Sequence, residues 1–436
     1  MKRLLLLILF SLLLAGRDGR AQGLEIDIVN GNAAALPIAV VAFDYLGASA
    51  TPDTDMAAVV RADLNRSGAF RTLAERDLVE RPLRQADVNF ATWRLLKQDF
   101  LVVGRVLDDN AGGYSTEFEL FDVAKQERML GLAVGGRAGN MRDVGHQIAD
   151  QIYEKILGVR GAFWTRIGYI TATGVGRNMQ YALMVADSDG YNPQTVVRSR
   201  EPLMSPNWSP DGRKLAYVSF ERGNSSIYIQ EIATGAREVV ASFRGINGAP
   251  AFSPDGRRLA LTLSRSGNPE IYVMDLASKG LTQITRHWGI DTEAVWSGDG
   301  QNLIFTSDRG GKPQIYQVAA TGGEAQRVTF KGEYNARASV ASDGKRIAMA
   351  QGGGNVYRIA VLDRSFGAGG EVVFLSPGNL DESPSFAPNG SMVLYAAREG
   401  RRGVLYAVSA DARVRQRLVL ADGDVREPAW SPYRQR

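Results

Sequence analysis

The 436-residue chain contains no cysteine and only two histidines, His146 and His287. Without cysteine it forms no disulfide and has no thiolate to act as a nucleophile or metal ligand. Two histidines so far apart in the sequence give little support to a histidine-based metal site or catalytic triad. The chemistry open to the chain is therefore that of carboxylates, hydroxyls and binding surfaces.

Short catalytic motifs are also missing. The sequence has no Gly-x-Ser-x-Gly elbow, no Gly-x-x-x-x-Gly-Lys phosphate loop and no His-Glu-x-x-His zinc motif. The serines nearest to an elbow, Ser115 and Ser225, lack the second glycine. We therefore expect a protein that is not an enzyme and that binds no cofactor.

Long apolar runs are absent except at the N-terminus. Lys2 and Arg3 precede an apolar run over residues 4–15, which is too short to span a bilayer, and Gly19 and Ala21 supply small residues for cleavage. The pattern predicts a signal peptide over residues 1–21, with an uncleaved anchor as the alternative. Residues 1–21 carry a net charge of +3, which leaves +1 of the total of +4 for the remaining chain. Nucleic-acid binding is therefore not expected.

What the chain has in abundance is one repeated phrase, an aromatic residue followed by Ser-Pro-Asp-Gly. Its copies are separated by 44, 44, 44, 46 and 44 residues. A period in the low forties with a tight turn in each copy is typical of four-stranded propeller blades. The copies begin at Trp208, Phe252, Trp296, a degraded Val340, Phe386 and a truncated Trp430.

The ends of the repeat predict how the ring closes. Only six residues follow Trp430, whereas three strand-like segments, residues 168–172, 181–186 and 194–197, precede the first phrase. A C-terminal strand that completes this first blade leaves no open sheet edge. We therefore predict a six-bladed β-propeller over residues 161–436, closed by the C-terminal strand.

Residues 22–160 alternate between strand and helix patterns, which predicts a separate α/β domain. His146 is expected to be a partly exposed residue on the polar face of the last helix. Strands are predicted over 38–43, 100–106, 116–121 and 129–134, and helices over 55–65, 91–97 and 141–157.

Polar residues recur five positions before the aromatic residue of the phrase, where each innermost strand begins. These are Asn247, Asp291, Asn335 and Asp381. They converge on one mouth of the ring, either as partner-binding groups or as residues that shape the loops. Two other classes of function stay open: a propeller enzyme (hydrolase or lyase) and a binder of a cation or small ligand in the channel. Both would use carboxylates at this mouth: Asp291, Glu293, Asp381 and Glu382.

A signal peptide, a cysteine-free α/β domain and six such phrases ending in Pro428-Ala429-Trp430-Ser431-Pro432 together resemble the TolB family of the Tol-Pal system. Residues 247–256 and 272–278 strengthen the resemblance, which covers essentially the whole chain. The resemblance implies a monomeric, non-enzymatic protein of the Gram-negative periplasm that acts in outer-membrane integrity and cell division.

The resemblance also implies the partners. The family's propeller binds the lipoprotein Pal, at positions that match Ile246, Asn247, Ala249, Thr292 and Glu293 here. The mature N-terminal segment, with Leu24, Glu25, Ile26 and Asp27, would bind TolA and switch conformation. Colicin-type toxins can exploit the propeller as well. Family members often carry His at the position of Ile246, so this contact is expected to be apolar and insensitive to pH.

Overall fold

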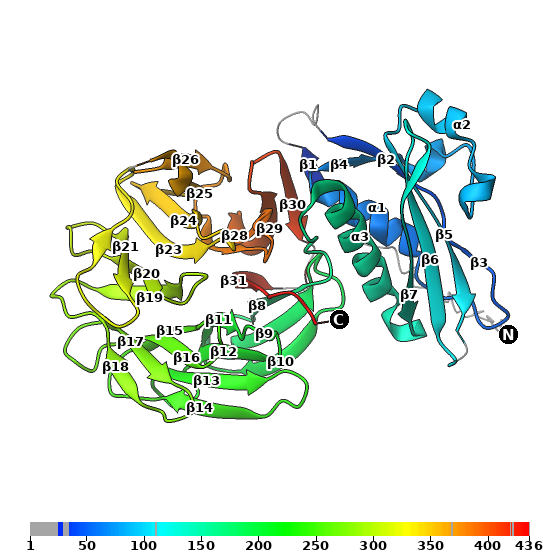
Figure 1. Ribbon diagram of the computed structural model, residues 1–436. Helices are drawn as coiled ribbons and strands as arrows, with labels where there is room; N and C mark the ends of the chain where they lie inside the picture. Colours follow the sequence, from blue (N-terminus) through cyan, green and yellow to red (C-terminus); the bar gives the residue numbers. More distant parts are fainter. Residues whose placement is uncertain are drawn as a thin grey trace, which may run out of the picture.

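The computed structural model describes residues 25–28, 35–109, 111–367, 369–418, 420 and 423–435. Figure 1 shows an α/β domain beside a ring of antiparallel sheets. The predicted signal peptide and Leu24 lie outside the described residues. Within the described part of the chain, no helix combines the length and the apolar character needed to cross a membrane.

The N-terminal domain is built on a mixed sheet. Strand β2 pairs in parallel with β4 and β5, whereas β5, β6 and β7 form an antiparallel meander. The strands span Leu36–Val40 (β2), Asp44–Tyr45 (β3, beside β5), Phe70–Thr72 (β4), Phe100–Asp108 (β5), Tyr114–Asp122 (β6) and Glu127–Gly136 (β7). The short β3 and β4 were not predicted, because two or three residues carry no periodic pattern.

Helices α1 (Met56–Arg66) and α3 (Met141–Leu157) pack together on this sheet. The Asp55 side chain caps α1 by accepting from the Ala58 N–H at 2.9 Å, and Gly158 ends α3 with φ of 74°. Helix α2 spans Phe90–Leu95. The three predicted helices are therefore confirmed. Short 3₁₀ helices cover Glu75–Asp77, Gln85–Asp87, Ala138–Asn140, Gly176–Asn178 and Arg364–Phe366.

The ring contains six blades, which we number I to VI in chain order of their second strands. From the channel outward, blade I is β31 (Asp424–Trp430), β8 (Arg166–Thr173), β9 (Gln180–Asp187) and β10 (Gln194–Ser199). Blade II is β11 (Leu203–Trp208), β12 (Lys214–Ser219), β13 (Ser226–Glu231) and β14 (Arg237–Ala241). Blade III is β15 (Asn247–Phe252), β16 (Arg258–Leu263), β17 (Glu270–Asp275) and β18 (Leu281–Gln283).

The remaining three blades follow the same pattern. Blade IV is β19 (Asp291–Trp296), β20 (Asn302–Ser307), β21 (Gln314–Ala319) and β22 (Gln326–Arg327). Blade V is β23 (Tyr334–Val340), β24 (Arg346–Gly353), β25 (Val356–Asp363) and β26 (Glu371–Phe374). Blade VI is β27 (Glu382–Phe386), β28 (Met392–Glu399), β29 (Arg402–Ser409) and β30 (Val414–Leu418). The predicted six-bladed propeller is confirmed.

Closure of the ring is also as predicted. Strand β31 pairs antiparallel with β8, so that the last strand of the chain completes the first blade. The Trp430 indole donates to the Thr165 hydroxyl at 2.8 Å, and the Ser431 N–H donates to the Arg166 carbonyl at 2.8 Å. These bonds join segments some 265 residues apart in the sequence.

The N-terminal segment adds a strand to the ring. Strand β1 (Glu25–Ile28) pairs antiparallel with β30, the outermost strand of blade VI. Glu25 lies opposite Arg417, and Ile28 lies opposite Val414. A segment that precedes the α/β domain in sequence therefore belongs to a propeller sheet in space (Figure 1).

We predict that deleting residues 425–436 destabilises the whole ring. The deletion removes the innermost strand of blade I and exposes the edge of β8. Because truncating one buried Trp costs about 3–5 kcal/mol, the free energy of unfolding should fall by more than ~3 kcal/mol. Chemical denaturation measures the change.

Removal of the exposed loop Glu221–Asn224 between β12 and β13 is the control and should cost far less. A truncated protein that unfolds at the parental denaturant concentration would show that blade I does not need β31.

Candidate partner-binding site at the propeller mouth

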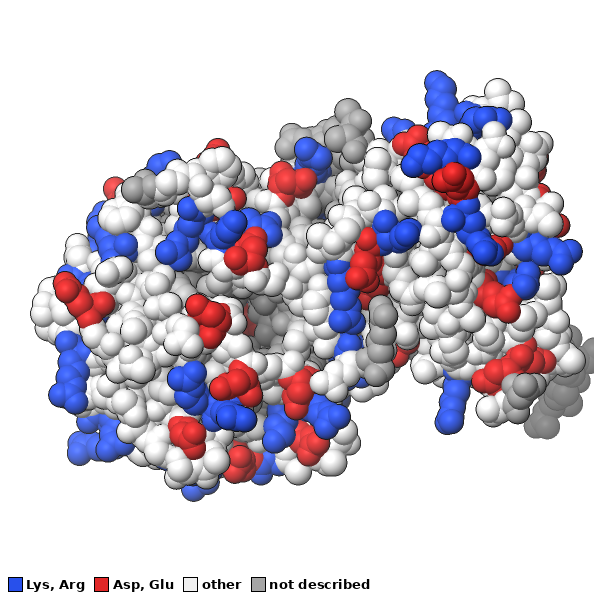
Figure 2. All heavy atoms as spheres, in the orientation of Figure 1, with Lys and Arg blue, Asp and Glu red and all other residues white. Residues whose placement is uncertain are grey.

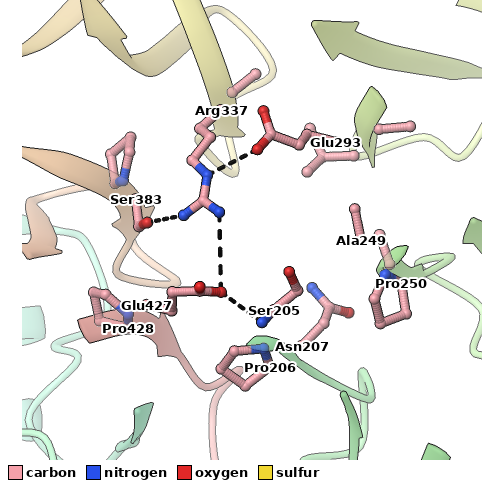
Figure 3. Close-up of a pocket in the computed structure, with 15 residues that line it drawn as sticks. Ser205, Pro206, Asn207, Ala249, Pro250, Glu293, Arg337, Ser383, Glu427 and Pro428 are labelled. Atoms are coloured by element: carbon pink, nitrogen blue, oxygen red, sulfur yellow. Dashed lines mark hydrogen bonds and ion pairs between the residues drawn. The ribbon is translucent and has the colours of Figure 1, made fainter. Parts of the chain in front are cut away.

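Each innermost strand is interrupted by a β-bulge at the same place, just before its second half. One non-glycine residue per blade takes a left-handed conformation there, with φ between 43° and 57°. Such backbone is uncommon for these residue types and turns them towards the channel. The six residues are Ser205, Ala249, Glu293, Arg337, Ser383 and Glu427, and they line the pocket drawn in Figure 3.

One arginine dominates the electrostatics of this pocket, whose volume is about 130 Å³. The Arg337 Nε donates to Glu293 Oε1 at 2.8 Å, and its Nη2 lies 3.9 Å from Glu427 Oε2 (Figure 3). A third nitrogen donates to the Ser383 hydroxyl. Burial alone would lower the pKa of Arg337, but the two carboxylates outweigh burial and raise it, so the guanidinium stays charged. A cation bound at these carboxylates would have to displace it.

The four Asn and Asp residues at the strand starts lie beneath the surface, each at most 2 % exposed. Asn247 accepts from the Phe243 N–H at 2.8 Å and donates to the Phe243 carbonyl at 2.7 Å. Asn335 donates to the Lys331 carbonyl at 2.9 Å, and Asp381 accepts from the Gly378 N–H at 3.1 Å. These bonds are what the loop-shaping interpretation expects. Burial leaves little of Asn247, Asp291, Asn335 and Asp381 accessible, and their direct contact with a partner stays a prediction.

Three of the four carboxylates considered for acid–base chemistry are buried or paired. Asp291 is buried and its Oδ2 accepts from Arg309 at 2.6 Å, while Glu293 pairs with Arg337. Burial raises the pKa of Asp381, which is covered, whereas Glu382 is exposed. Two of the four are therefore held by arginines.

The loops at the mouth expose several large apolar side chains among charged ones such as Arg244, Arg286 and Lys331. Ile246 and Ile290 stand directly before β15 and β19, Leu380 stands two residues before β27, and each is about half exposed. Trp288 and Phe330, in the same set of loops, are 77 % and 62 % exposed. We call these five residues the apolar rim. Trp288 and Phe330 were missed by the sequence analysis, although an aromatic residue in a loop otherwise rich in polar residues is a usable signal.

The ring is hollowed at its centre (Figure 2). Ala249, Thr292 and Glu293 are half-buried, and Ala249 and Glu293 line the pocket between the innermost strands. Thr292 and Thr262 lie with their hydroxyls 3.3 Å apart, and the Glu293 N–H donates to Thr262 at 3.2 Å. Ala249 and Glu293 therefore lie in one pocket, and Ile246 and Thr292 lie in or directly before the same two innermost strands, β15 and β19.

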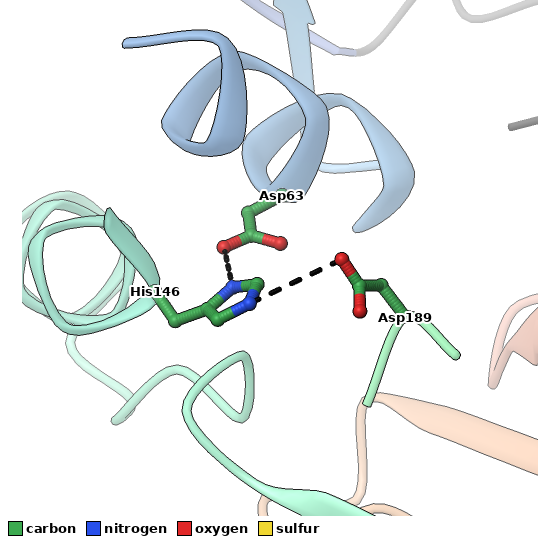
Figure 4. Close-up of side chains that lie close together, drawn as sticks. All are labelled: Asp63, His146 and Asp189. Atoms are coloured by element: carbon green, nitrogen blue, oxygen red, sulfur yellow. Dashed lines mark hydrogen bonds and ion pairs between the residues drawn. The ribbon is translucent and has the colours of Figure 1, made fainter. Parts of the chain in front are cut away.

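A second cluster of charge lies where the two domains meet (Figure 4). His146 on α3 is only 1 % exposed, which corrects the expectation of a partly exposed residue. Its Nδ1 lies 2.6 Å from Asp63 on α1, and its Nε2 lies 4.0 Å from Asp189 in the turn after β9. Helix α1 and this propeller turn cover the polar face of α3. The sequence of α3 alone does not predict this contact.

Two arginines bind the same carboxylates. Arg66 donates to Asp63 at 2.9 Å and to the Ser188 hydroxyl at 2.9 Å, and Arg142 pairs with Asp189. Asp63, His146 and Asp189 lie close enough together to hold a metal ion, but a dication there would lie beside both guanidinium groups. The surroundings favour a proton on His146 over a metal.

The pKa values at this junction follow from the same contacts. Burial alone would lower the pKa of His146, but Asp63 and Asp189 outweigh burial and raise it above its ordinary value of 6.5. Burial would raise the pKa of Asp189, but His146, Arg66 and Arg142 lower it to about 2. Burial raises the pKa of Asp150 and of Asp187 to about 6. The protonation of each group at the junction therefore depends on the charges of the others.

We predict that stability falls as the pH rises from 6 to 8.5. A histidine whose pKa is raised by folding stabilises the protein fully below about pH 6.5, and this stabilisation is lost as the pH rises through the folded-state pKa. The raised pKa values of Asp150 and Asp187 act with the same sign at slightly lower pH. Thermal unfolding at both pH values measures the effect.

The His146→Gln variant is the control, because glutamine keeps a polar side chain that does not titrate. Its melting temperature should be lower than that of the parent at pH 6 and should change less between pH 6 and 8.5. An equal pH dependence in both proteins would show that His146 is not the titrating group.

Comparison with known proteins matches both parts of the chain. The model of the TolB amino-terminal domain matches residues 24–129, and the model of the TolB beta propeller domain matches residues 153–434. The Tol-Pal system protein TolB of Xanthomonas oryzae pv. oryzae (strain PXO99A) is 72 % identical over 413 residues, which are 95 % of this chain and 94 % of that protein. The corresponding protein of Xanthomonas campestris pv. campestris (strain B100) is 71 % identical with the same coverage.

A solved structure agrees with these matches. The crystal structure of TolB from Acinetobacter baumannii is 41 % identical, superposes with a TM-score of 0.85, and covers 94 % of this chain and 100 % of its own. Domain order, blade number and sequence identity point to the same family. The chain therefore belongs to the TolB family of Tol-Pal system proteins.

Proposed function

We propose that the protein is an exported, non-enzymatic component of the Tol-Pal system, which binds Pal at the propeller mouth and TolA through its N-terminal segment. In this role it links the two partners in outer-membrane integrity and cell division. The observation that carries the proposal is the apolar rim, because exposed apolar residues around a rigid mouth are typical of a protein interface and not of a catalytic pocket.

The rim is held in place before any partner binds. The Ile246 N–H donates to the Ser264 hydroxyl at 2.7 Å, and one blade further the Ile290 N–H donates to Asp308 at 2.7 Å. Asn247 donates to the Phe243 carbonyl in the loop that precedes Ile246, and Asp291, directly after Ile290, accepts from Arg309. A surface ordered in this way loses little conformational entropy on binding, which supports tight association with Pal.

The N-terminal segment supports the second part of the proposal. Strand β1 joins blade VI through four residue pairs, from Glu25 opposite Arg417 to Ile28 opposite Val414. So short a strand costs little to release, and an extended segment can pair with a sheet edge of another protein. Release from blade VI would make the segment available to TolA, and pairing with β30 would withdraw it.

We predict that Ala249→Arg and Thr292→Arg each reduce capture of Pal at least ~10-fold, because bulk and charge at the wall of the mouth disrupt a desolvated contact. Both residues are half-buried on the mouth wall. Immobilised Pal and purified mature variants measure capture, and circular dichroism checks the fold.

Val239→Arg is the matched control, since Val239 is an exposed apolar residue on the outermost strand of blade II. It should leave capture unchanged. Pal capture by both mouth variants at the parental level would place the Pal site elsewhere on the protein.

We predict that Ile26→Pro in the mature chain abolishes capture of TolA and leaves capture of Pal intact. Proline removes the backbone N–H that β-pairing requires, both on blade VI and on a partner's sheet edge. Ile26→Val keeps the N–H and serves as the control. Undiminished TolA capture by Ile26→Pro would contradict β-pairing through this segment.

A further inference from the structure

The turns of neighbouring blades contact one another through one repeated pair of residues. The proline of one Ser-Pro-Asp-Gly turn packs against the glycine of the next turn around the ring. In three junctions a proline ring atom lies 3.6 Å from the position that a glycine Cβ would take: Pro210 with Gly256, Pro254 with Gly300, and Pro432 with Gly212. At three junctions, therefore, the turn of one blade accepts the proline ring of the preceding blade.

The junction between blades IV and V lacks this contact. Gly298 stands where four of the other five turns carry proline, and the Cβ position of Gly344 has no atom within 4 Å. The side chains beside this turn are also smaller than those at the preceding junction. Between blades III and IV the Arg258 guanidinium lies 4.5 Å from the Trp296 ring centre and donates to the Gly300 carbonyl at 3.3 Å. Asn302 and Val340 occupy these two positions one blade later.

The missing groups leave a groove of about 320 Å³ between blades IV and V. It is lined by the apolar side chains of Ile304, Val340 and Ile347 and by the charged side chains of Asp299, Asp343 and Arg364. Asp343 accepts from Arg346 at 2.7 Å, and Arg364 donates to Gln317 at 3.2 Å. Asp299 accepts only from its own turn, from the Ser297 hydroxyl and the Gln301 N–H, among the hydrogen bonds found in the described residues.

We propose that this groove is a peptide-binding site for a partner segment that carries a proline and, four residues later, a basic residue. The proline ring would lie between Gly298 and Gly344, as Pro254 lies against Gly300 one junction earlier. The basic side chain would lie over Val340 towards Asp299, where Arg258 lies over Trp296 at that junction. Apolar side chains that contact the ring and the Asp299 carboxylate that faces the cation are complementary to such a segment.

The groove is separate from the Pal site proposed above. Strand β19 runs from Asp291 at the mouth to Trp296 at the turn, so the groove and the apolar rim lie at opposite ends of the innermost strands. A single ring and a single charge give weak binding, with a Kd of about 10⁻⁴ to 10⁻³ M. Such affinity suits a contact that adds to a stronger one elsewhere.

The test uses the mature protein and a labelled synthetic peptide with the sequence of residues 251–258, Ala-Phe-Ser-Pro-Asp-Gly-Arg-Arg, the segment that fills the preceding junction. Fluorescence anisotropy measures binding. The peptide should bind saturably with a Kd below about 1 mM, and replacement of its proline by alanine should weaken binding at least ~10-fold.

Gly298→Pro should abolish peptide binding, because it supplies the missing ring from within the protein. Proline stands at the equivalent position in four other turns, so the variant should fold and melt no lower than the parent. Asp299→Asn should weaken binding several-fold, and Asp255→Asn, the same change in the filled turn of blade III, should leave it unchanged.

Saturable binding that Gly298→Pro does not reduce, or no binding at millimolar peptide, would overturn the proposal. Equal affinity for N-acetylproline amide would also overturn it, because the groove would then be a site for a small molecule. Ala249→Arg should bind the peptide normally, which separates this result from a failure of the proposed Pal site.

Discussion

The structure depends on the pairing of β31 with β8, which joins the two ends of the propeller within one sheet. An open ring would leave an unpaired innermost strand edge and an exposed face on each terminal blade. The tail that follows β31 extends this closure to the N-terminal domain. Arg434 pairs with Asp143 on α3 at 2.7 Å and lies 4.8 Å from the centre of the Trp164 ring. The same few residues thus close the ring and attach the second domain to it.

Closure also fixes the channel. Six left-handed residues, one per blade, face a common axis only because the blades are held in a ring. Across this axis Arg337 of blade V contacts Glu293 of blade IV and Glu427 of blade I. These partly buried ion pairs connect three blades through one guanidinium. The mouth therefore presents its apolar rim on a preorganised scaffold.

Much of this architecture could be predicted from the sequence because its causes are local and repeated. Each Ser-Pro-Asp-Gly phrase predicts a turn, and the spacing of the phrases predicts the number of strands in a blade. The few residues after Trp430 predict that the last strand joins the first blade. The helix that ends at Gly158 could also be predicted, since its C-terminal glycine and its apolar periodicity indicate the same helix.

The features that were not predicted depend on packing between distant segments. His146 is buried by a turn of the other domain, and Asn247 and Asp291 are covered by loops whose course the sequence leaves open. The pairing of β1 with β30 joins residues almost 400 positions apart. The degraded copy that begins at Val340 was visible in the repeat, but the groove beside it follows only from what the other junctions contain.

Native-state hydrogen exchange of the mature protein tests most directly the claim that the ring is one cooperative unit closed by β31. We expect the slowest amides of β8 and β31 to exchange with the same opening free energy as those of β12, β16 and β20, since opening of blade I opens the whole ring. Exchange from β8 and β31 at a free energy several kcal/mol lower than in the other blades would contradict the account.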